Sequence, residues 1–369
     1  MQEGVFVAEE SLTDGPFPQG KLIIDLTVDD LICIAEVEDS VVDVAEGEDF
    51  DRMAKADALY LREGFPIPEK KVVRGSADGV EVWGGYVEGR AGRVSVRPEK
   101  RMTLAALGLI GLSLGASGEA LQSLIGSFGY VLAFRRECLA LLDVLYVFSR
   151  KVAPRIRRAV GGAAGDELFA MSLLMPVVEA DLRLEISTLV GATDASSLAG
   201  GACFAHVEAE VADKLYEMAE DRGAHVRLDW GPEEPPIRLR DERGAAAEVA
   251  GDLSWEVCLE FDFRHPSHIN LLELHVVVAY VRWLSVRGIR NKRVLILCDS
   301  QVVVGAVSKG RSSSRRVNFL LRKLLGLCLQ FHIRLELIWV PTFANPGDCP
   351  SRHSDLLEWC AALPGKQRA

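Results

Sequence analysis

Apolar residues in the second half of the chain form short continuous runs and longer segments in which they recur every three or four positions. The short runs are rich in Val, Ile and Leu and predict β-strands at 186–193, 200–207, 255–263, 293–299 and 334–342. The longer segments predict helices at 268–288, 300–308 and 316–332. Strands that alternate with helices are typical of an α/β domain, and residues 208–252 fit neither pattern.

The first half of the chain alternates less regularly. Residues 22–37 form two apolar runs separated by Asp29 and Asp30, which predicts a hairpin with these acids at its turn. Residues 80–96 predict a second hairpin with glycine-rich turns, and the periodicity of 49–65 predicts a helix between the two.

A small helical bundle is predicted for residues 102–160, where apolar positions again recur every three or four residues. Glycine-rich stretches at 115–118 and 126–129 predict the breaks between its helices, and the glycines of 160–166 predict a linker to the α/β domain.

Charge is distributed unevenly along this pattern. The net charge of −11 argues at first against a nucleic-acid partner, because polyanions repel acidic proteins. However, residues 1–50 hold 14 Asp and Glu against one Lys, whereas residues 89–160 carry 12 Lys and Arg against four acids. Residues 281–325 carry 11 basic residues against one acid. The two basic blocks favour a phosphate-binding surface, and solvated helix faces are the alternative.

The cysteine spacing and the N-terminal sequence indicate the cellular compartment of the protein. The eight cysteines are far apart and form no CxxC pair, which indicates reduced, buried thiols rather than disulfides or a zinc site. The longest weakly charged run, 103–118, is shorter than the roughly 20 apolar residues of a membrane span. The N-terminus lacks the pattern of a signal peptide. We therefore expect an intracellular protein, cytoplasmic or nuclear, that has no membrane partner.

Four acids in the α/β half are candidates for chemistry. Asp194, Asp299 and Asp348 follow predicted strands, where each by itself could be a turn residue or a helix N-cap. Glu273 is different, because Leu272 and Leu274 flank it within an apolar helix, where an unpaired charge would cost several kcal/mol. Acids that converge from strand ends and helix starts form the ligand set that paired Mg²⁺ ions require.

These residues lie in motifs that resemble a known family. The stretches "TDAS", "HINLLEL", "LCDSQVVVGAVSKGRSSS" and "LIWVPTFANPGDCPSRH" resemble the ribonuclease H domain of retroelement polyproteins, closest to DIRS-type retrotransposons, over about residues 185–355. The resemblance implies that Asp194, Glu273, Asp299 and Asp348 bind two Mg²⁺ ions, for which Mn²⁺ can substitute. It implies hydrolysis of the RNA strand of an RNA·DNA hybrid, with one ion generating the attacking hydroxide and the other stabilising the leaving 3′-oxygen.

Polar and basic residues near these acids and in the basic blocks are expected to contact the nucleic acid. They are Ser300, Gln301, Lys309, Arg311, Asn345, Arg135 and Arg136. Many ribonucleases H also use a histidine shortly before the last acid, and "WVPTFANPGD" contains none. Proton transfer would then fall to water or another group, or activity would be reduced.

The first half resembles the end of a reverse transcriptase. "LTVDDLICI" is similar to the palm motif of an aromatic residue, any residue and two aspartates, here Asp29 and Asp30, with Leu26 in place of the aromatic. The basic helical stretch resembles the thumb and connection. Few residues precede Asp29, so we expect a truncated copy that does not polymerise by itself.

The expected protein is therefore α/β, with a C-terminal ribonuclease-H-like mixed five-stranded sheet and flanking helices. A partial palm (1–98), thumb and connection helices (99–160) and a linker (161–184) precede that domain (185–362). The first functional hypothesis is the two-metal endonuclease. The alternatives are a non-catalytic nucleic-acid-binding remnant and, less favoured, another ribonuclease-H-like nuclease that cuts DNA.

Overall fold

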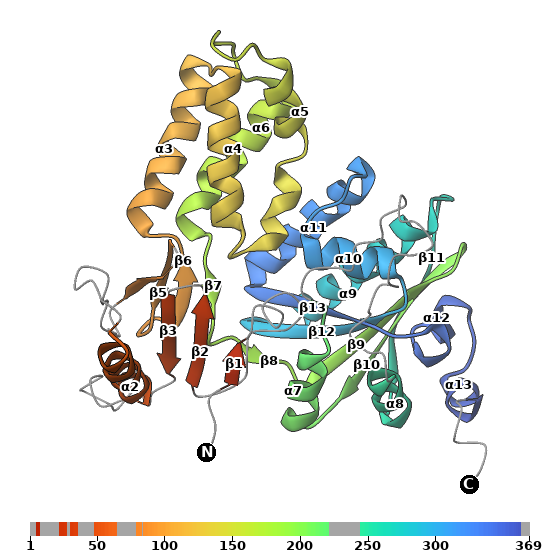
Figure 1. The fold of residues 1–369 in the computed structure, drawn as a ribbon. Helices are drawn as coiled ribbons and strands as arrows, with labels where there is room; N and C mark the ends of the chain where they lie inside the picture. Colours follow the sequence, from red (N-terminus) through yellow and green to blue (C-terminus); the bar gives the residue numbers. More distant parts are fainter. Residues whose placement is uncertain are drawn as a thin grey trace, which may run out of the picture. The chain divides into compact units, whose positions relative to one another are not determined.

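The computed structural model describes residues 5–7, 22–27, 30–35, 48–64, 79–82, 84–220 and 244–362. The chain forms two compact units, one of Met1–Ala105 with Leu174–Arg183 and one of Ala106–Leu173 with Leu184–Ala369. The sheet of the predicted α/β domain lies entirely in the second unit, which therefore also holds the four candidate acids (Figure 1).

The first unit contains two small sheets. One has the order β1 (Val5–Val7), β2 (Leu22–Thr27), β3 (Asp30–Ala35), and the other β4 (Val80–Val82), β5 (Gly85–Glu88), β6 (Arg93–Ser95), β7 (Ala180–Asp181). Helix α2 (Glu48–Arg62) contacts β3. The first predicted hairpin and the helix after it are confirmed, whereas residues 80–96 form three antiparallel strands rather than one hairpin. In the first hairpin, Thr27 pairs with Asp30 across the turn.

The helices predicted for residues 102–160 are α3 (Pro98–Leu114), α4 (Gly118–Leu132), a 3₁₀ turn η3 (Arg136–Leu141) and α5 (Val144–Lys151). The break at 115–118 is confirmed, with Gly115 at φ +72. The break predicted at 126–129 is wrong, because α4 continues through both glycines. Its buried face of Leu121, Ile125, Phe128 and Leu132 keeps helical spacing, and packing outweighs the low helix propensity of glycine.

The segment for which a linker is predicted, 161–184, contains regular structure. Helix α6 (Gly162–Leu174) runs beside α3, where Gly108 allows the close approach of Ser172 because a side chain at this position would overlap the Ser172 hydroxyl. The turn η4 (Met175–Val177) and β7 follow it.

The α/β domain is built on a mixed sheet of order β11-β10-β9-β12-β13, with the short β8 (Glu185–Ile186) paired to β12. Its strands are β9 (Leu189–Ala195), β10 (Ala199–His206), β11 (Glu256–Asp262), β12 (Lys292–Cys298) and β13 (Ile333–Trp339). Strand β10 is antiparallel to β9 and β11, whereas β12 is parallel to β9 and β13. The predicted mixed sheet with flanking helices is confirmed, and the short β8 adds a sixth strand to the five predicted.

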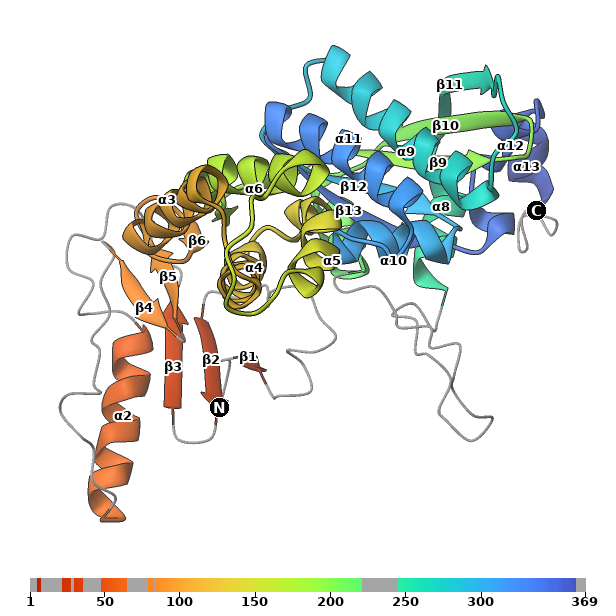
Figure 2. The same ribbon diagram turned by 90° about the horizontal axis from the view of Figure 1, so that it is seen from above.

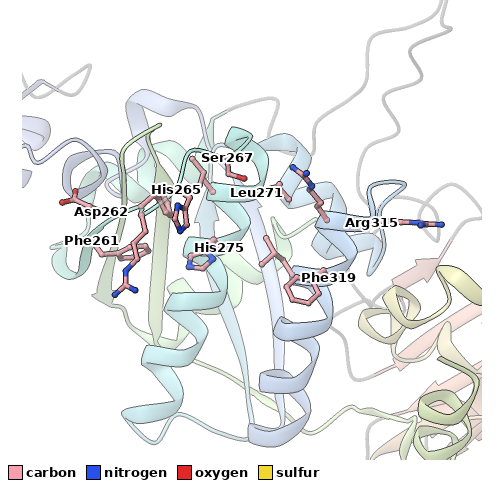
Figure 3. A pocket seen from close by; sticks show the side chains of 13 residues that line it. Phe261, Asp262, His265, Ser267, Leu271, His275, Arg315 and Phe319 are labelled. Atoms are coloured by element: carbon pink, nitrogen blue, oxygen red, sulfur yellow. The ribbon is translucent and has the colours of Figure 1, made fainter. Parts of the chain in front are cut away.

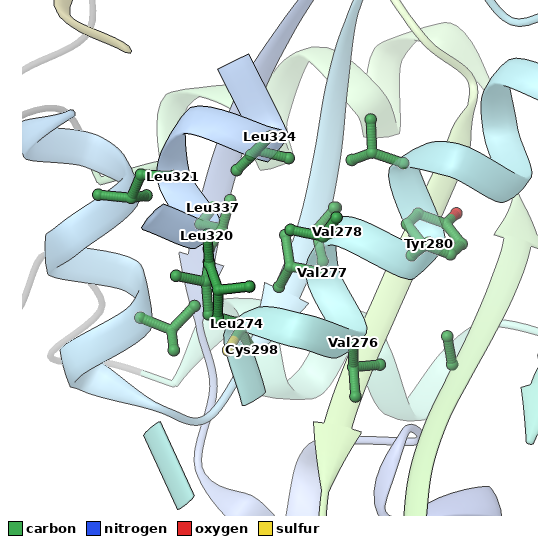
Figure 4. Close-up of a cluster of buried hydrophobic side chains, with 14 of the residues drawn as sticks. Leu274, Val276, Val277, Val278, Tyr280, Cys298, Leu320, Leu321, Leu324 and Leu337 are labelled. Atoms are coloured by element: carbon green, nitrogen blue, oxygen red, sulfur yellow. The ribbon is translucent and has the colours of Figure 1, made fainter. Parts of the chain in front are cut away.

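Three helices cover one face of this sheet, namely α9 (Ile269–Val286), α10 (Gln301–Lys309) and α11 (Arg315–Phe331). Figures 1 and 2 show α9 and α11 side by side across the strands. Their apolar faces meet Val294, Ile296 and Cys298, which alternate along β12. Figure 4 shows Cys298 close to Leu274 of α9 and Leu320 of α11. Helix α9 is long and apolar enough to cross a membrane, and here it is the central core helix of the domain.

Two helices at the ends of the unassigned stretch 208–252 cover the opposite face of the sheet. Helices α7 (Ala209–Glu217) and α8 (Ala245–Asp252) place Leu215, Tyr216, Ala246 and Ala250 in one cluster with the intervening positions of β12, Leu295 and Leu297. Successive side chains of β12 therefore point to opposite faces of the sheet and pack in two different hydrophobic cores.

Within the second unit, an ion pair and hydrogen bonds connect the helices at 106–173 to the α/β domain. Arg322 of α11 contacts Glu167 of α6 at 2.5 Å and donates to the carbonyl of Ala140 at 2.9 Å. Glu167 is buried, and its other oxygen accepts the backbone N–H of Leu145 at 2.7 Å. Gly310, the residue after α10, lies against the backbone of Arg136. Helix η3, which begins at Arg136, is therefore next to the end of α10.

Candidate metal centre

Two of the four acids meet because their strands are parallel neighbours. The pairing of Cys298 with Thr193 puts the next residue of each strand, Asp299 and Asp194, at the same end of the sheet. Adjacent strands are about 4.8 Å apart, which is within reach of two carboxylates. The backbone of Asp299 is held by Trp339, whose indole N–H donates to its carbonyl at 3.1 Å.

Glu273 enters from helix α9, which crosses this end of the sheet. The helix begins at Ile269 with His268 as its N-cap, and its first turns direct Glu273 inward with a side chain only 6% exposed. The ligand atoms of Glu273, Cys298 and Asp299 all lie within 4.8 Å of one another. The acid in the apolar helix, singled out from the sequence, therefore joins the acid at the strand end.

Asp348 arrives on the short helix α12 (Asp348–Ser351), which follows the turn η5 (Thr342–Ala344) and is followed by α13 (Leu356–Ala362). Two glycines permit the approach of this segment. A side chain on Gly201, which pairs with Asp194, would overlap Ser351 and Pro350, and one on Gly347 would crowd the backbone of Thr193 and Asp194. Glycine at both positions thus lets α12 dock on β9 and β10.

Docking of α12 adds contacts that the sequence did not indicate. The hydroxyl of Ser351 donates to Oδ2 of the buried Asp194. Arg352 lies on the solvent side and contacts Asp348, Nε to Oδ1, at 2.6 Å. His353 contacts β11 through Glu260 at 2.5 Å and Asp262 at 3.4 Å. Ser351, Arg352 and His353 all belong to the motif "GDCPSRH". Their partners become known only from the way α12 packs on β10.

The buried acids titrate abnormally. Burial raises the pKa of Glu273 to about 9, with further increases from the charges of Asp194 and Asp299. Burial likewise raises the pKa of Asp194 to about 7; the hydrogen bond from Ser351 opposes this rise, and Asp299 and Asp348 add to it. These carboxylates therefore retain protons at a pH at which ordinary acids are ionised.

The residues present fit hard divalent cations. Oε2 of Glu273 is buried and has no hydrogen-bond partner in the part of the chain that the structure describes, which a cation would remedy. The donors are carboxylate oxygens, the ligands that Mg²⁺ and Mn²⁺ prefer. Cys298 is fully buried, and burial holds its pKa well above the usual value, so it remains a neutral thiol that is poorly suited to Mg²⁺.

Among the predicted nucleic-acid contacts, Asn345 has another role. It is 0% exposed, and its amide nitrogen donates to the carbonyl of Thr193 at 3.0 Å and to Oδ1 of Asp299 at 3.3 Å. It offers no surface to a nucleic acid, so the contact expected from the sequence is wrong, and it orients Asp299 instead. Ser300 is the half-buried N-cap of α10, and Gln301 is exposed at its first turn.

The two basic blocks meet at the end of α10. The positive charges of Arg136 and Arg311 both act on Lys309, together with the acid Glu220, and burial is the largest cause that lowers the pKa of Lys309. Arg136 and Lys309 are half-buried and Arg311 is exposed. Arg135 differs from these three, because it is 13% exposed and contacts Glu137 at 2.7 Å.

Of the two acids in the palm-like motif, Asp29 and Asp30, the structure describes only Asp30. Asp29 lies outside the described residues, and Asp30 begins β3. Asp30 belongs to the first unit, whereas the four acids of the candidate metal centre belong to the second.

Comparisons with known proteins give two solved structures of interest. The foamy viral protease-reverse transcriptase dRH in complex with double-stranded DNA has TM-score 0.36 and 13% identity, over 85% of this chain and 45% of that one. The foamy viral protease-reverse transcriptase in complex with an RNA/DNA hybrid has TM-score 0.33 and 13% identity, over 92% of this chain and 59% of that one. The chain thus spans about half the length of these two. No family model matches it, and neither does any curated protein.

The raised pKa values predict how stability depends on pH. Without divalent cations, the folded protein keeps protons on Asp194 and Glu273 after the unfolded chain has lost them, so the free energy of unfolding falls as pH rises from about 4 to about 9. Glu273→Gln removes the buried charge and should raise stability near pH 9 by a few kcal/mol, with little effect near pH 4.

Calorimetric melting in a chelator between pH 4.5 and 9 measures this difference. The control is Glu248→Gln, an exposed acid on α8, which should leave the pH profile unchanged. A Glu273→Gln variant that is less stable than the parent at every pH would assign Glu273 a structural role and contradict the prediction.

Proposed function

We propose that this protein is a two-metal endonuclease that hydrolyses the RNA strand of RNA·DNA hybrids. The observation that carries the proposal is the meeting of Glu273 and Asp299 beside Asp194 and Asp348, with one oxygen of Glu273 buried and unpartnered among the described residues. A fold needs no such cluster for stability, because like charges buried together are destabilising.

The four acids would hold Mg²⁺ or Mn²⁺, and bound ions would supply a nucleophile at neutral pH and stabilise the charge of the leaving oxygen. The chain's own residues set the positions of these acids. Asn345 orients Asp299, Ser351 holds one oxygen of Asp194, and Arg352 restrains Asp348 at the solvent side. Mutation of these three residues should therefore affect metal affinity more than binding of nucleic acid.

The surroundings of the centre and the motif resemblance support the proposed substrate class. Arg136, Lys309 and Arg311 form a positive cluster (the α10 basic cluster) within the same unit as the acids. A polyanion that extends from the acids to this cluster would be held by its phosphates. Among polyanions, the four motifs that resemble a ribonuclease H domain favour an RNA·DNA hybrid.

We further propose that the nuclease belongs to a DIRS-type retroelement reverse transcriptase. The palm-like hairpin in the first unit would then belong to the palm, and the helices of 99–160 to the thumb and connection. The location of the protein would be intracellular, in the cytoplasm or the nucleus.

Asp299→Asn tests the catalytic assignment. The substitution removes a ligand charge but little volume, and its amide oxygen can still accept the hydrogen bond of Asn345. Cleavage of a labelled RNA·DNA hybrid in Mg²⁺ should fall by at least ~10²–10³-fold, because the lost stabilisation is several kcal/mol.

The matched control is Asp213→Asn, an exposed acid on α7, which should cleave like the parent. Duplex DNA and duplex RNA distinguish the hybrid nuclease from a DNA nuclease. A folded parent protein that binds hybrid without cutting it in Mg²⁺ or Mn²⁺ would contradict the proposal and favour the non-catalytic remnant.

The α10 basic cluster is tested by salt. A double variant, Lys309→Gln with Arg311→Gln, should weaken hybrid binding and reduce the slope of log affinity against log salt by about one for each phosphate that is no longer neutralised. Lys214→Gln on α7 is the control, because this exposed lysine lies on the helix that covers the opposite face of the sheet. Equal slopes for the parent and the double variant would show that the α10 basic cluster does not bind the hybrid.

A further inference from the structure

A pocket of about 650 Å³ opens in the α/β domain next to the helix that carries Glu273 (Figure 3). Its walls are the end of β11 with residues 264–267, the first turns of α9 and the first turns of α11. Leu272, which precedes Glu273, lines it from α9. Neither the metal centre nor the α10 basic cluster makes use of this pocket.

One wall of the pocket is aromatic. The rings of Phe261 and Phe263 are 5.4 Å apart, and the ring of His275 lies 6.2 and 6.1 Å from them, all with edge-to-face inclinations. Burial, and secondarily the charge of Lys323, lowers the pKa of His275, so its imidazole is neutral near pH 7. The three rings together provide an uncharged surface for a planar ligand.

The opposite wall carries another ring. Phe319 on α11 is 57% exposed, and Figure 3 shows it across the pocket from Phe261 and His275. Lys323 lies over this ring, 4.7 Å from its centroid. A single exposed phenylalanine is common on protein surfaces. A phenylalanine that lines the same pocket as three further rings can form one wall of a site for a flat aromatic group.

Arginines line the same pocket. Arg264, Arg315 and Arg316 belong to its lining, together with His265, and Figure 3 shows Arg315 extending outward from α11. Asp262 is the acidic residue of the lining, and it contacts His353. An apolar interior with a cationic margin complements a ligand that joins a flat ring to an anion, whereas an apolar peptide would gain nothing from the arginines.

We propose that this pocket, the aromatic subsite, binds an unpaired nucleotide of a single-stranded segment. The base would lie between Phe319 and the ring wall, and the adjoining phosphates would meet the arginines at the start of α11. The subsite extends the proposed function, on which it rests, because it would receive a single strand that continues from the hybrid. Binding can be read without cleavage, so the two proposals can fail separately.

Fluorescence anisotropy in a chelator, with a labelled oligothymidine and an abasic strand of equal length, tests the subsite. Phe319→Ala should weaken binding of oligothymidine by about tenfold and leave binding of the abasic strand within about twofold, because stacking contributes about 1–3 kcal/mol per base. Phe319→Trp should restore or exceed the parent affinity, whereas Phe319→Leu, which keeps apolar volume but no ring, should not.

Phe169→Ala is the matched control, because this phenylalanine is 50% exposed on α6, away from the pocket. Equal affinity of the parent for the abasic and the base-containing strands would show that only phosphates are bound and overturn the subsite. An unchanged oligothymidine affinity in Phe319→Ala would do the same, and would leave an apolar protein segment as the competing occupant. Hybrid cleavage lost in Asp299→Asn but retained in Phe319→Ala would leave the nuclease assignment intact in either case.

Discussion

Mutual repulsion among buried carboxylates is the constraint on which the candidate site depends. Asp194 and Glu273 are 4% and 6% exposed, and both lie within the field of Asp299 and Asp348. Such a cluster lowers stability unless protons or cations neutralise it. The arrangement persists because rigid elements impose it, namely two parallel strands, a core helix and a short helix docked on glycines.

The scaffold around the acids can be understood from this constraint. Core helix α9 keeps Glu273 in place through Leu274 and Val277 in one large apolar cluster, so the cost of burying the acid is offset by its neighbours in the helix (Figure 4). Gly201 and Gly347 give α12 its close approach, and Ser351 and Arg352 then contact two different acids. The ion pair of Arg322 with Glu167 joins the same domain to helices that bring Arg136 beside Lys309.

Sequence patterns predicted most of this architecture because its signals are local. The strands that carry Asp194 and Asp299 are continuous apolar runs, and Glu273 is conspicuous as an acid within an apolar helix. The failures are non-local. The sequence predicts a surface position for Asn345, because its hydrogen-bond partner, Thr193, is on a strand distant in sequence. It predicts a helix break at Gly126, because the sequence does not show how the neighbouring residues of α4 pack. Residues 208–252 were unassigned, since α7 and α8 are recognisable only by the sheet face that they cover.

Uptake of divalent cations with release of protons tests the central claim most directly. Titration calorimetry with Mn²⁺ or Mg²⁺ at pH 8, in two buffers of different ionisation enthalpy, reports both quantities at once. The raised pKa of Glu273 predicts binding accompanied by release of roughly one proton, because a carboxylate must be ionised to act as a ligand, and Glu273→Gln should abolish that release. Absence of metal binding, or binding without proton release, would contradict the account of these acids as a metal centre.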